Sequence, residues 1–294
     1  RTKIIAFNNA YHGDTFGAMA VSGRSAFTKP FDALLFDVAF IDLPTAENIS
    51  YLKSQISNLK STAAAFIFEP LVQGTAGMQM YESRALDELV GFCQEHQIIT
   101  IADEVMTGFG RTGKLFASLN LQHQPDIFCL SKGITGGTMA LGLTTCTQQL
   151  FDAFLSDDKL KTLFHGHSYT ANPVACAAAL ASLDLLLDEK CSKQREMIEQ
   201  EHRSFKKQLK KHALIADVRV QGTILALDIQ TPEGLTYFSS IRDRLYDFFI
   251  SKKVLMRPLG NTVYIMPPYC IQKEELQEIY GVIEEALQML SKVD

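Results

Sequence analysis

Two charged residues, Asp103 and Lys132, stand at the ends of two short apolar runs in the middle of the chain. The two runs cover residues 98–102 and 126–131. Short apolar runs bounded by polar or glycine-rich turns are typical of buried parallel strands. A third run, residues 63–68, ends at Glu69. Because open α/β sheets bind ligands outside the carboxyl ends of their strands, we expect Glu69, Asp103 and Lys132 to meet at one site.

A lysine and an aspartate at the same sheet edge favour one particular chemistry. The amine of a partly desolvated lysine is a nucleophile that forms a Schiff base with an aldehyde. Pyridoxal phosphate needs such a lysine, and it also needs a carboxylate that keeps its pyridine nitrogen protonated. Taken alone, Asp103 could cap a turn and Lys132 could extend into solvent. Both residues interrupt otherwise apolar runs, and this favours the cofactor site.

The composition excludes several other classes of protein. Of the 294 residues, 47% are hydrophobic and 21% are charged, which is enough for a sizeable core and unlike a disordered chain. The net charge of −5 argues against nucleic-acid binding, which requires a basic surface. No apolar run reaches the roughly 18 residues of a membrane span. The six cysteines form no C-x-x-C pattern, so we expect a protein of the reducing cytoplasm.

The order of the predicted elements indicates an α/β fold in residues 1–190. Residues 4–8 are predicted to form a strand, and helices are predicted over residues 48–59 and 84–96. Each helix precedes one of the strands described above. Strands that alternate with helices are the signature of a mostly parallel central sheet.

The last third of the chain has a different pattern. A charged helix at residues 191–213 is expected to connect the large domain to a small α+β domain at residues 214–294. The strands expected in the small domain are residues 215–220, 223–229, 254–258 and 262–267, and the helices are residues 236–252 and 273–290. Arg257 interrupts an apolar strand, which suits bidentate binding of a carboxylate, although a structural ion pair is an equal alternative.

Residues 108–113 match the pattern G-x-G-x-x-G and suggest a dinucleotide site. That fingerprint must open a helix directly after a strand, whereas residues 114–125 lack helical continuity. We interpret the segment as a glycine-rich loop beside the site and keep a dinucleotide-dependent oxidoreductase as an alternative. His165 and His167 are not followed by a third ligand of suitable spacing, so no metal site is expected.

Several motifs of the chain resemble those of the class III aminotransferases, which depend on pyridoxal phosphate and have fold type I. The motifs are Tyr11-His12-Gly13, Asp103-Glu104-Val105, Thr107 to Gly113, Ser131-Lys132-Gly133 and Asn172-Pro173. Further segments resemble the branch of this family that works in biotin biosynthesis, namely residues 12–19, 165–173, 218–222, 257–260 and 264–269. The resemblance covers essentially the whole chain. It implies a large domain with a mostly parallel sheet and a small C-terminal α+β domain.

The resemblance also implies a role for each matching residue near the cofactor, pyridoxal 5'-phosphate. Lys132 would form the Schiff base and move the substrate proton, and Asp103 would pair with the pyridine nitrogen. Tyr11 and Val105 would pack on the two faces of the ring, and His12 belongs to the same cofactor-binding group. Lys132, Asp103 and Tyr11 are the residues that the resemblance marks as catalytic.

Other matching residues imply a partner subunit and a substrate. Ser168 would reach the cofactor phosphate of the partner, which implies a homodimer with its active site at the subunit interface. Arg257 would bind the carboxylate of a keto acid. Asp14, Tyr264 and Gly166 match further substrate-binding positions.

The implied reaction is the transfer of an amino group to 7-keto-8-aminopelargonate, with S-adenosylmethionine as the donor. Some relatives use lysine as the donor, and an ω-amino-acid aminotransferase is the alternative within the family. Met106 stands where relatives place a glutamine that contacts the ring hydroxyl. Members of the family also have a preceding segment with a phosphate-binding loop, and we expect that segment to be missing from this chain.

Overall fold

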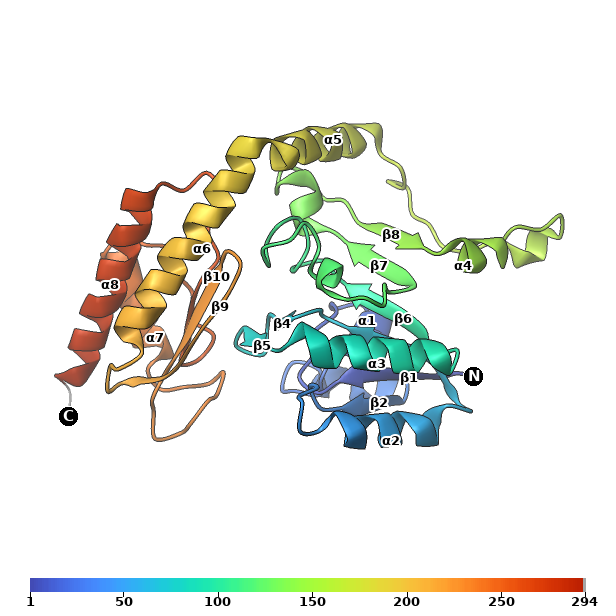
Figure 1. Cartoon of the computed structure of the whole chain (residues 1–294), viewed down its shortest axis with the longest axis horizontal. Helices are drawn as coiled ribbons and strands as arrows, with labels where there is room; N and C mark the ends of the chain where they lie inside the picture. The colour runs from blue at the N-terminus through green and yellow to red at the C-terminus, as the bar shows by residue number, and fades with distance from the viewer. Residues whose placement is uncertain (293–294) are drawn as a thin grey trace. The chain divides into compact units, whose positions relative to one another are not determined.

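The computed structural model describes residues 1–292, which form two compact units. The first unit consists of Arg1–Leu71, Tyr81–Phe109 and Phe116–Leu186. The second consists of Val72–Met80, Gly110–Leu115 and the chain from Leu187 onward. Two short segments from the first half of the sequence therefore belong with the C-terminal part. Figure 1 follows the chain from β1 in blue to α8 in red.

A six-stranded sheet forms the centre of the first unit, with the strand order β2-β1-β3-β6-β7-β8. The strands are β1 (Lys3–Phe7), β2 (Val38–Ile41), β3 (Ala63–Phe68), β6 (Ile99–Asp103), β7 (Ile127–Leu130) and β8 (Leu143–Cys146). All neighbouring strands are parallel except β7 and β8, which are antiparallel. The prediction of a mostly parallel sheet is thus confirmed. Strand β2 was not predicted from the sequence.

Helices and 3₁₀ turns accompany the strands of the first unit, and one of the helices packs an apolar stripe on the sheet. The helices are α1 (Phe16–Val21), α2 (Ile49–Leu59), α3 (Ser83–Glu95), α4 (Gln148–Asp152) and α5 (Pro173–Leu187), and the 3₁₀ turns are η1 (Lys29–Leu34), η2 (Ala117–Asn120), η3 (Lys132–Thr135) and η4 (Lys159–Lys161). In α3, Leu86, Leu89 and Val90 are fully buried, and the helix contacts β6 and α2. The core beneath them is aromatic, since Phe7 and Phe66 are both inaccessible and their ring centroids lie 5.1 Å apart.

A three-stranded antiparallel sheet with the order β11-β10-β9 forms the centre of the second unit. The strands are β9 (Ile215–Gln221), β10 (Ile224–Ile229) and β11 (Thr262–Ile265), and the helices are α6 (Glu189–Leu209), α7 (Arg242–Ser251) and α8 (Lys273–Ser291). The helices and the sheet share one apolar core that includes Phe205, Leu227 and Phe249. A two-stranded hairpin, β4 (Val72–Gln73) and β5 (Gln79–Met80), also belongs to this unit. We call Val72–Met80 the hairpin segment.

Two predicted elements of the second unit are wrong. Residues 254–258 form no strand, because Pro258 has no N–H for a ladder and the chain makes only an isolated bridge between Leu259 and Thr262. The helix expected from residue 236 begins at Arg242. The preceding segment is held elsewhere, because the backbone N–H of Thr236 donates to Asn261 Oδ1 at 3.1 Å.

None of the helices within residues 1–292 combines the length and the apolar character needed to cross a membrane. The longest, α6, has 21 residues, but its sequence is rich in lysine and glutamate.

Candidate active site

Three neighbouring strands of the large sheet end beside one another with polar side chains. β3, β6 and β7 lie next to each other and run in parallel, so their carboxyl ends share one edge. Glu69 directly follows β3, Asp103 is the last residue of β6, and Lys132 comes two residues after β7. The topology therefore agrees with the predicted meeting of these three positions at one edge.

The carboxylate of Asp103 has two well-defined partners. His12 Nδ1 lies 2.7 Å from Asp103 Oδ2, and because a carboxylate only accepts, the ring nitrogen is the donor. The backbone N–H of Val105 donates to Asp103 Oδ1 at 3.1 Å. The side chains of His12 and Asp103 are only 2% and 10% exposed. His12 Nε2 is buried and has no hydrogen-bond partner among the described residues.

The loop that carries His12 is fixed from three directions. The backbone N–H of Tyr11 donates to Glu69 Oε1 at 3.0 Å, and that of His12 donates to Ser22 Oγ at 2.9 Å. Gly23 is required behind the loop, because a Cβ there would lie 2.8 Å from the Cα of Asn9. The Tyr11 ring is 37% exposed, and its pKa is raised by burial and by a hydrogen bond to Asp14. Glu69 is thus a positioning residue for the loop.

Glu104 organises the chain that follows Asp103. Its carboxylate accepts hydrogen bonds from the backbone N–H of Ser118 at 2.7 Å, from that of Ala117 at 3.0 Å and from Thr107 Oγ1 at 2.8 Å. Burial raises the pKa of this carboxyl, and the hydrogen bonds oppose that shift. Sequence reasoning assigned Glu104 no role of its own. The signal in the sequence was a second acid directly after Asp103, next to the apolar run of residues 98–102.

Lys132 has an unusual backbone conformation. Its φ is +47°, in the left-handed region, which costs a non-glycine residue on the order of 1 kcal/mol. Ser131 and Gly133 hold the turn on either side: Ser131 Oγ donates to Leu141 O at 2.7 Å, and a Cβ at Gly133 would lie 2.9 Å from the Phe109 Cβ. The side chain of Lys132 is exposed, which corrects the expectation of a partly desolvated amine.

The remaining predicted residues of the first unit lie on its surface. Gly166 and Ser168 belong to an exposed loop whose described hydrogen bonds run between its own residues, from His167 N to Thr170 Oγ1 and from Tyr169 N to His167 Nδ1. These contacts do not bring the loop to Asp103 or Lys132.

Arg257 and Tyr264 belong to the second unit. Arg257 is exposed and forms no ion pair with an acidic side chain within residues 1–292, which weakens the alternative of a structural ion pair. Tyr264 lies half-buried on β11. Burial raises the pKa of the Tyr264 phenol, nearby Arg257 lowers it and Tyr237 raises it. The charge of Arg257 therefore acts on the Tyr264 phenol, and both residues belong to the second unit.

The glycine-rich segment packs closely against other parts of the protein. A Cβ at Gly110 would lie 2.5 Å from Arg195 Nη1. Gly222, in the turn between β9 and β10, packs so closely that its Cβ would lie 2.3 Å from Gly113 N. The pattern G-x-G-x-x-G therefore reflects close packing within the second unit, and no helix follows it directly.

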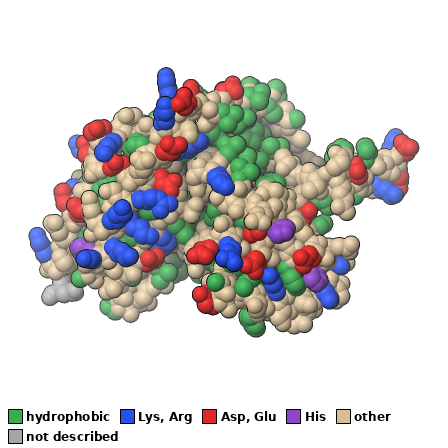
Figure 2. Space-filling model, viewed as in Figure 1, with side chains coloured by type: hydrophobic (Ala, Val, Ile, Leu, Met, Phe, Trp, Pro, Cys, Tyr) green, Lys and Arg blue, Asp and Glu red, His purple; other side chains and the backbone are tan. Residues whose placement is uncertain are grey.

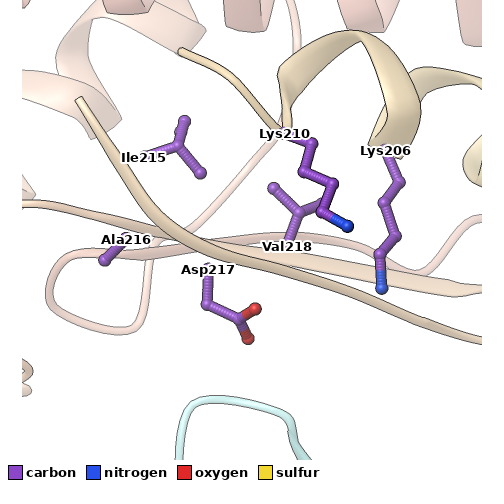
Figure 3. Close-up of a pocket in the computed structure, with 6 residues that line it drawn as sticks. All are labelled: Lys206, Lys210, Ile215, Ala216, Asp217 and Val218. Atoms are coloured by element: carbon purple, nitrogen blue, oxygen red, sulfur yellow. The ribbon is translucent and has the colours of Figure 1, made fainter. Parts of the chain in front are cut away.

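One surface pocket of the second unit is lined by none of the predicted site residues. Figure 3 shows Lys206 and Lys210 at the end of α6 and four residues from the start of β9. No buried polar group faces it, so we assign it no role. Residues 1–292 also contain no group of three or more His, Cys, Asp or Glu side chains that could hold a metal ion.

Comparison with known proteins decides the family. The model of the family "Aminotransferase class-III" matches residues 1–287. The chain belongs to the class-III aminotransferases. The resemblance inferred from the sequence motifs is thereby confirmed, and membership of this family removes the basis for the oxidoreductase alternative.

Individual members of the family are similar over almost the whole chain. The adenosylmethionine-8-amino-7-oxononanoate aminotransferase of Synechococcus elongatus is 43% identical over 297 residues, which cover 98% of this chain and 69% of that protein. The crystal structure of the enzyme of the same name from Methanocaldococcus jannaschii has a TM-score of 0.92 at 33% identity, and the match covers 98% of this chain and 68% of that one. A PLP-bound amine transaminase from an uncultivated Pseudomonas species has a TM-score of 0.90 at 32% identity, covering 98% and 70%. The sequence matches thus show the family, and the structural matches show the fold.

Proposed function

We propose that this aminotransferase uses pyridoxal 5'-phosphate to convert 7-keto-8-aminopelargonate to 7,8-diaminopelargonate in biotin biosynthesis. The observation that carries the proposal is the buried Asp103–His12 pair at the sheet edge where Lys132 follows β7. The name shared by the relatives at 43% and 33% identity supports the substrate.

The residues at this edge fit the cofactor by their chemistry. When bound, pyridoxal phosphate supplies an electron sink for charge that develops on the substrate carbon. Asp103 keeps a negative charge beside the pyridine nitrogen, and His12 fixes the orientation of that carboxylate through the 2.7 Å hydrogen bond. Lys132 Nζ would hold the cofactor covalently, and once the substrate amine has displaced it, the freed amine would be the base that takes the proton from the carbon bearing the amino group. Tyr11 and Val105 flank Asp103 and are the candidates for packing on the ring.

Arg257 and Tyr264 form the proposed carboxylate subsite. The guanidinium of Arg257 is free of acidic partners within the described chain and can bind a carboxylate with two parallel hydrogen bonds. Asp14, which is hydrogen-bonded to Tyr11, and Gly166 complete the proposed substrate-binding set.

A homodimer is part of the proposal. Figure 2 shows hydrophobic side chains gathered over α5, where Val174, Leu180, Leu185 and Leu187 are 62% to 73% exposed. Leu160 and Phe164, which precede the loop of Ser168, are 81% and 77% exposed. Apolar surface of this kind is expected to be covered by a partner. A second copy would bury it and would bring the loop of Ser168 to the cofactor phosphate of the neighbouring site.

The donor and the compartment are also proposed. S-adenosylmethionine is the expected donor, consistent with the names of the relatives, and lysine is the alternative. The similarity to an amine transaminase keeps an ω-amino-acid aminotransferase as the second candidate function. All six cysteines are free, which supports a reducing cytoplasm.

An assay of the protein expressed from its complete gene tests the function. Enzyme loaded with pyridoxal 5'-phosphate is incubated with the keto acid and either S-adenosylmethionine or lysine, and the diamine product is measured by mass spectrometry. We expect product with S-adenosylmethionine, and we expect none from Lys132→Ala. Conversion of other ω-amino acids without any diamine product would establish the second candidate instead.

A further inference from the structure

Arg219 on β9 has oxygen partners for all five of its N–H groups. Nη1 donates to Asp217 Oδ2 at 2.9 Å and to Asp228 Oδ2 at 2.6 Å. Nη2 donates to Asp228 Oδ1 at 2.9 Å and to the Gly77 carbonyl at 2.5 Å, and Nε donates to the Met78 carbonyl at 2.9 Å. The side chain is only 13% exposed, so these bonds are shielded from water.

Both carbonyls belong to the hairpin segment, Val72–Met80. Gly77 has a φ of +74°, and a Cβ at this position would lie 3.0 Å from Thr262 Oγ1. That hydroxyl donates to Asp228 Oδ1 at 2.7 Å. The carboxylate that pairs with Arg219 therefore also orients the Thr262 side chain against which Gly77 packs. The hairpin segment therefore lies on the three-stranded sheet, where β5 contacts β9 (Figure 1).

The same face of the sheet carries Tyr264. Ala226 on β10 pairs with Arg219 on β9 and with Tyr264 on β11. Residues paired across antiparallel strands point to the same face, so these three side chains form one row. Ala226 is small and fully buried, and it is the only residue of the row between the arginine and the tyrosine. Val263 and Ile265, the neighbours of Tyr264, point instead into the helical core.

We propose that Arg219 is a positioning residue for substrate binding, because it holds the hairpin segment as a wall beside Tyr264. The inference rests on the proposed function, since it takes Arg257 and Tyr264 as the subsite of the keto-acid carboxylate. A lysine at position 219 could not form the same set of hydrogen bonds. Its ammonium has three donors on a flexible side chain and cannot bind the Asp228 carboxylate bidentately while it also donates to two carbonyls.

The test compares Arg219→Lys with the wild-type enzyme, both loaded with cofactor. The lysine keeps a positive charge beside Asp228, so the sheet is retained while the two carbonyls are released. We expect the KM for the keto acid to rise about fivefold or more, and the KM for the amino donor to stay within about twofold. Hydrogen exchange of the amides in residues 72–80 should become about tenfold faster in the absence of substrate.

A matched control and a second variant keep the test decisive. Asp217→Asn alters an exposed partner of Arg219 whose described hydrogen bond does not involve the hairpin segment, so both KM values and the exchange rates should remain unchanged. If Arg219→Lys fails to fold, Gly77→Ala perturbs the same segment through its φ of +74° and replaces neither residue of the Arg219–Asp228 ion pair, and it should show the same KM pattern.

Three results would overturn the proposal. Unchanged exchange over residues 72–80 would show that Arg219 does not anchor the segment. Faster exchange with equal changes in both KM values would show that the segment has no part in keto-acid binding. Failure of the wild-type enzyme to convert the keto acid would contradict the proposed function as well. Because wild-type activity is measured first, this failure is distinguished from a failure of the Arg219 proposal alone.

Discussion

His12 and Asp103 are 91 residues apart in the sequence, yet His12 Nδ1 donates to Asp103 Oδ2 at 2.7 Å in a buried setting. A buried carboxylate that keeps its charge needs such a donor, because an unpaired charge in this environment would favour the protonated form. The pair therefore has a direct consequence for catalysis. In the proposed function Asp103 would act on the cofactor as an oriented carboxylate, and His12 together with the backbone N–H of Val105 would supply the orientation.

We expect His12→Ala to lower kcat about tenfold or more, because a hydrogen bond to a charged group contributes about 1.5–3 kcal/mol. His12→Asn should restore part of the loss, since its amide can donate to Asp103. Steady-state kinetics of both variants provide the measurement. His123→Ala is the matched control, because His123 also pairs with an aspartate, Asp87, but is 49% exposed. Equal losses in the His12 and His123 variants would show that the effect is not specific to the site.

Lys132→Ala should abolish the covalent attachment of the cofactor. Lys132 is the lysine that follows the carboxyl end of β7, beside the strand that ends in Asp103. The measurement is mass spectrometry of the protein after reduction with borohydride in the presence of pyridoxal phosphate. Lys159→Ala, an exposed lysine of η4, should retain the adduct in full. A trapped adduct in the Lys132 variant would assign the cofactor to another lysine.

The meeting of Asp103 and Lys132 at one sheet edge could be predicted from the sequence. Both follow apolar runs, and the carboxyl ends of neighbouring parallel strands necessarily share an edge. The partner of Asp103 could not be predicted from spacing alone. His12 reaches it from a loop after β1, and the position of that loop depends on Ser22, 10 residues after His12, and on Glu69, 58 residues after Tyr11.

Other features depended on tertiary contacts that leave no local pattern. The hairpin segment and Gly110–Leu115 join the second unit because Arg219 and the turn at Gly222 bind them, and both of these residues come more than a hundred positions later. Residues 254–258 looked like a strand because they are apolar, but a strand also needs a partner and free N–H groups. The exposure of Lys132 likewise depends on the turn around it, which the apolar run before it does not determine.

Arg257→Ala should raise the KM for the keto acid about thirtyfold, with a much smaller effect on the amino donor. The loss of a charge-assisted pair costs about 2 kcal/mol or more, and only the keto acid presents a carboxylate at this position in the proposed function. Kinetics with each substrate varied in turn are the measurement. Arg244→Ala, an exposed arginine on α7, should leave both constants unchanged. An equal rise in KM for both substrates would show that Arg257 has a structural role and does not bind the carboxylate of the keto acid.

His202 makes the second unit sensitive to acid. It is fully buried on α6, where its Nδ1 lies 2.6 Å from Tyr280 Oη and its Nε2 lies 3.2 Å from the Thr223 carbonyl. The carbonyl only accepts, so Nε2 carries the proton and Nδ1 accepts from the tyrosine. Burial lowers the pKa of His202 from 6.5 to about 4.

This depressed pKa means that the unfolded chain binds a proton between about pH 6.5 and pH 4 that the folded chain does not. The contribution of His202 to stability is therefore fully present above pH 6.5 and is lost as the pH falls, by up to about 3 kcal/mol in total. We expect the urea midpoint of the wild-type protein to fall between pH 7.5 and pH 5 more steeply than that of His202→Gln, whose side chain does not titrate. His165→Gln, in the exposed loop, should follow the wild type. Parallel curves for wild type and His202→Gln would mean that this histidine titrates alike in the folded and unfolded chain.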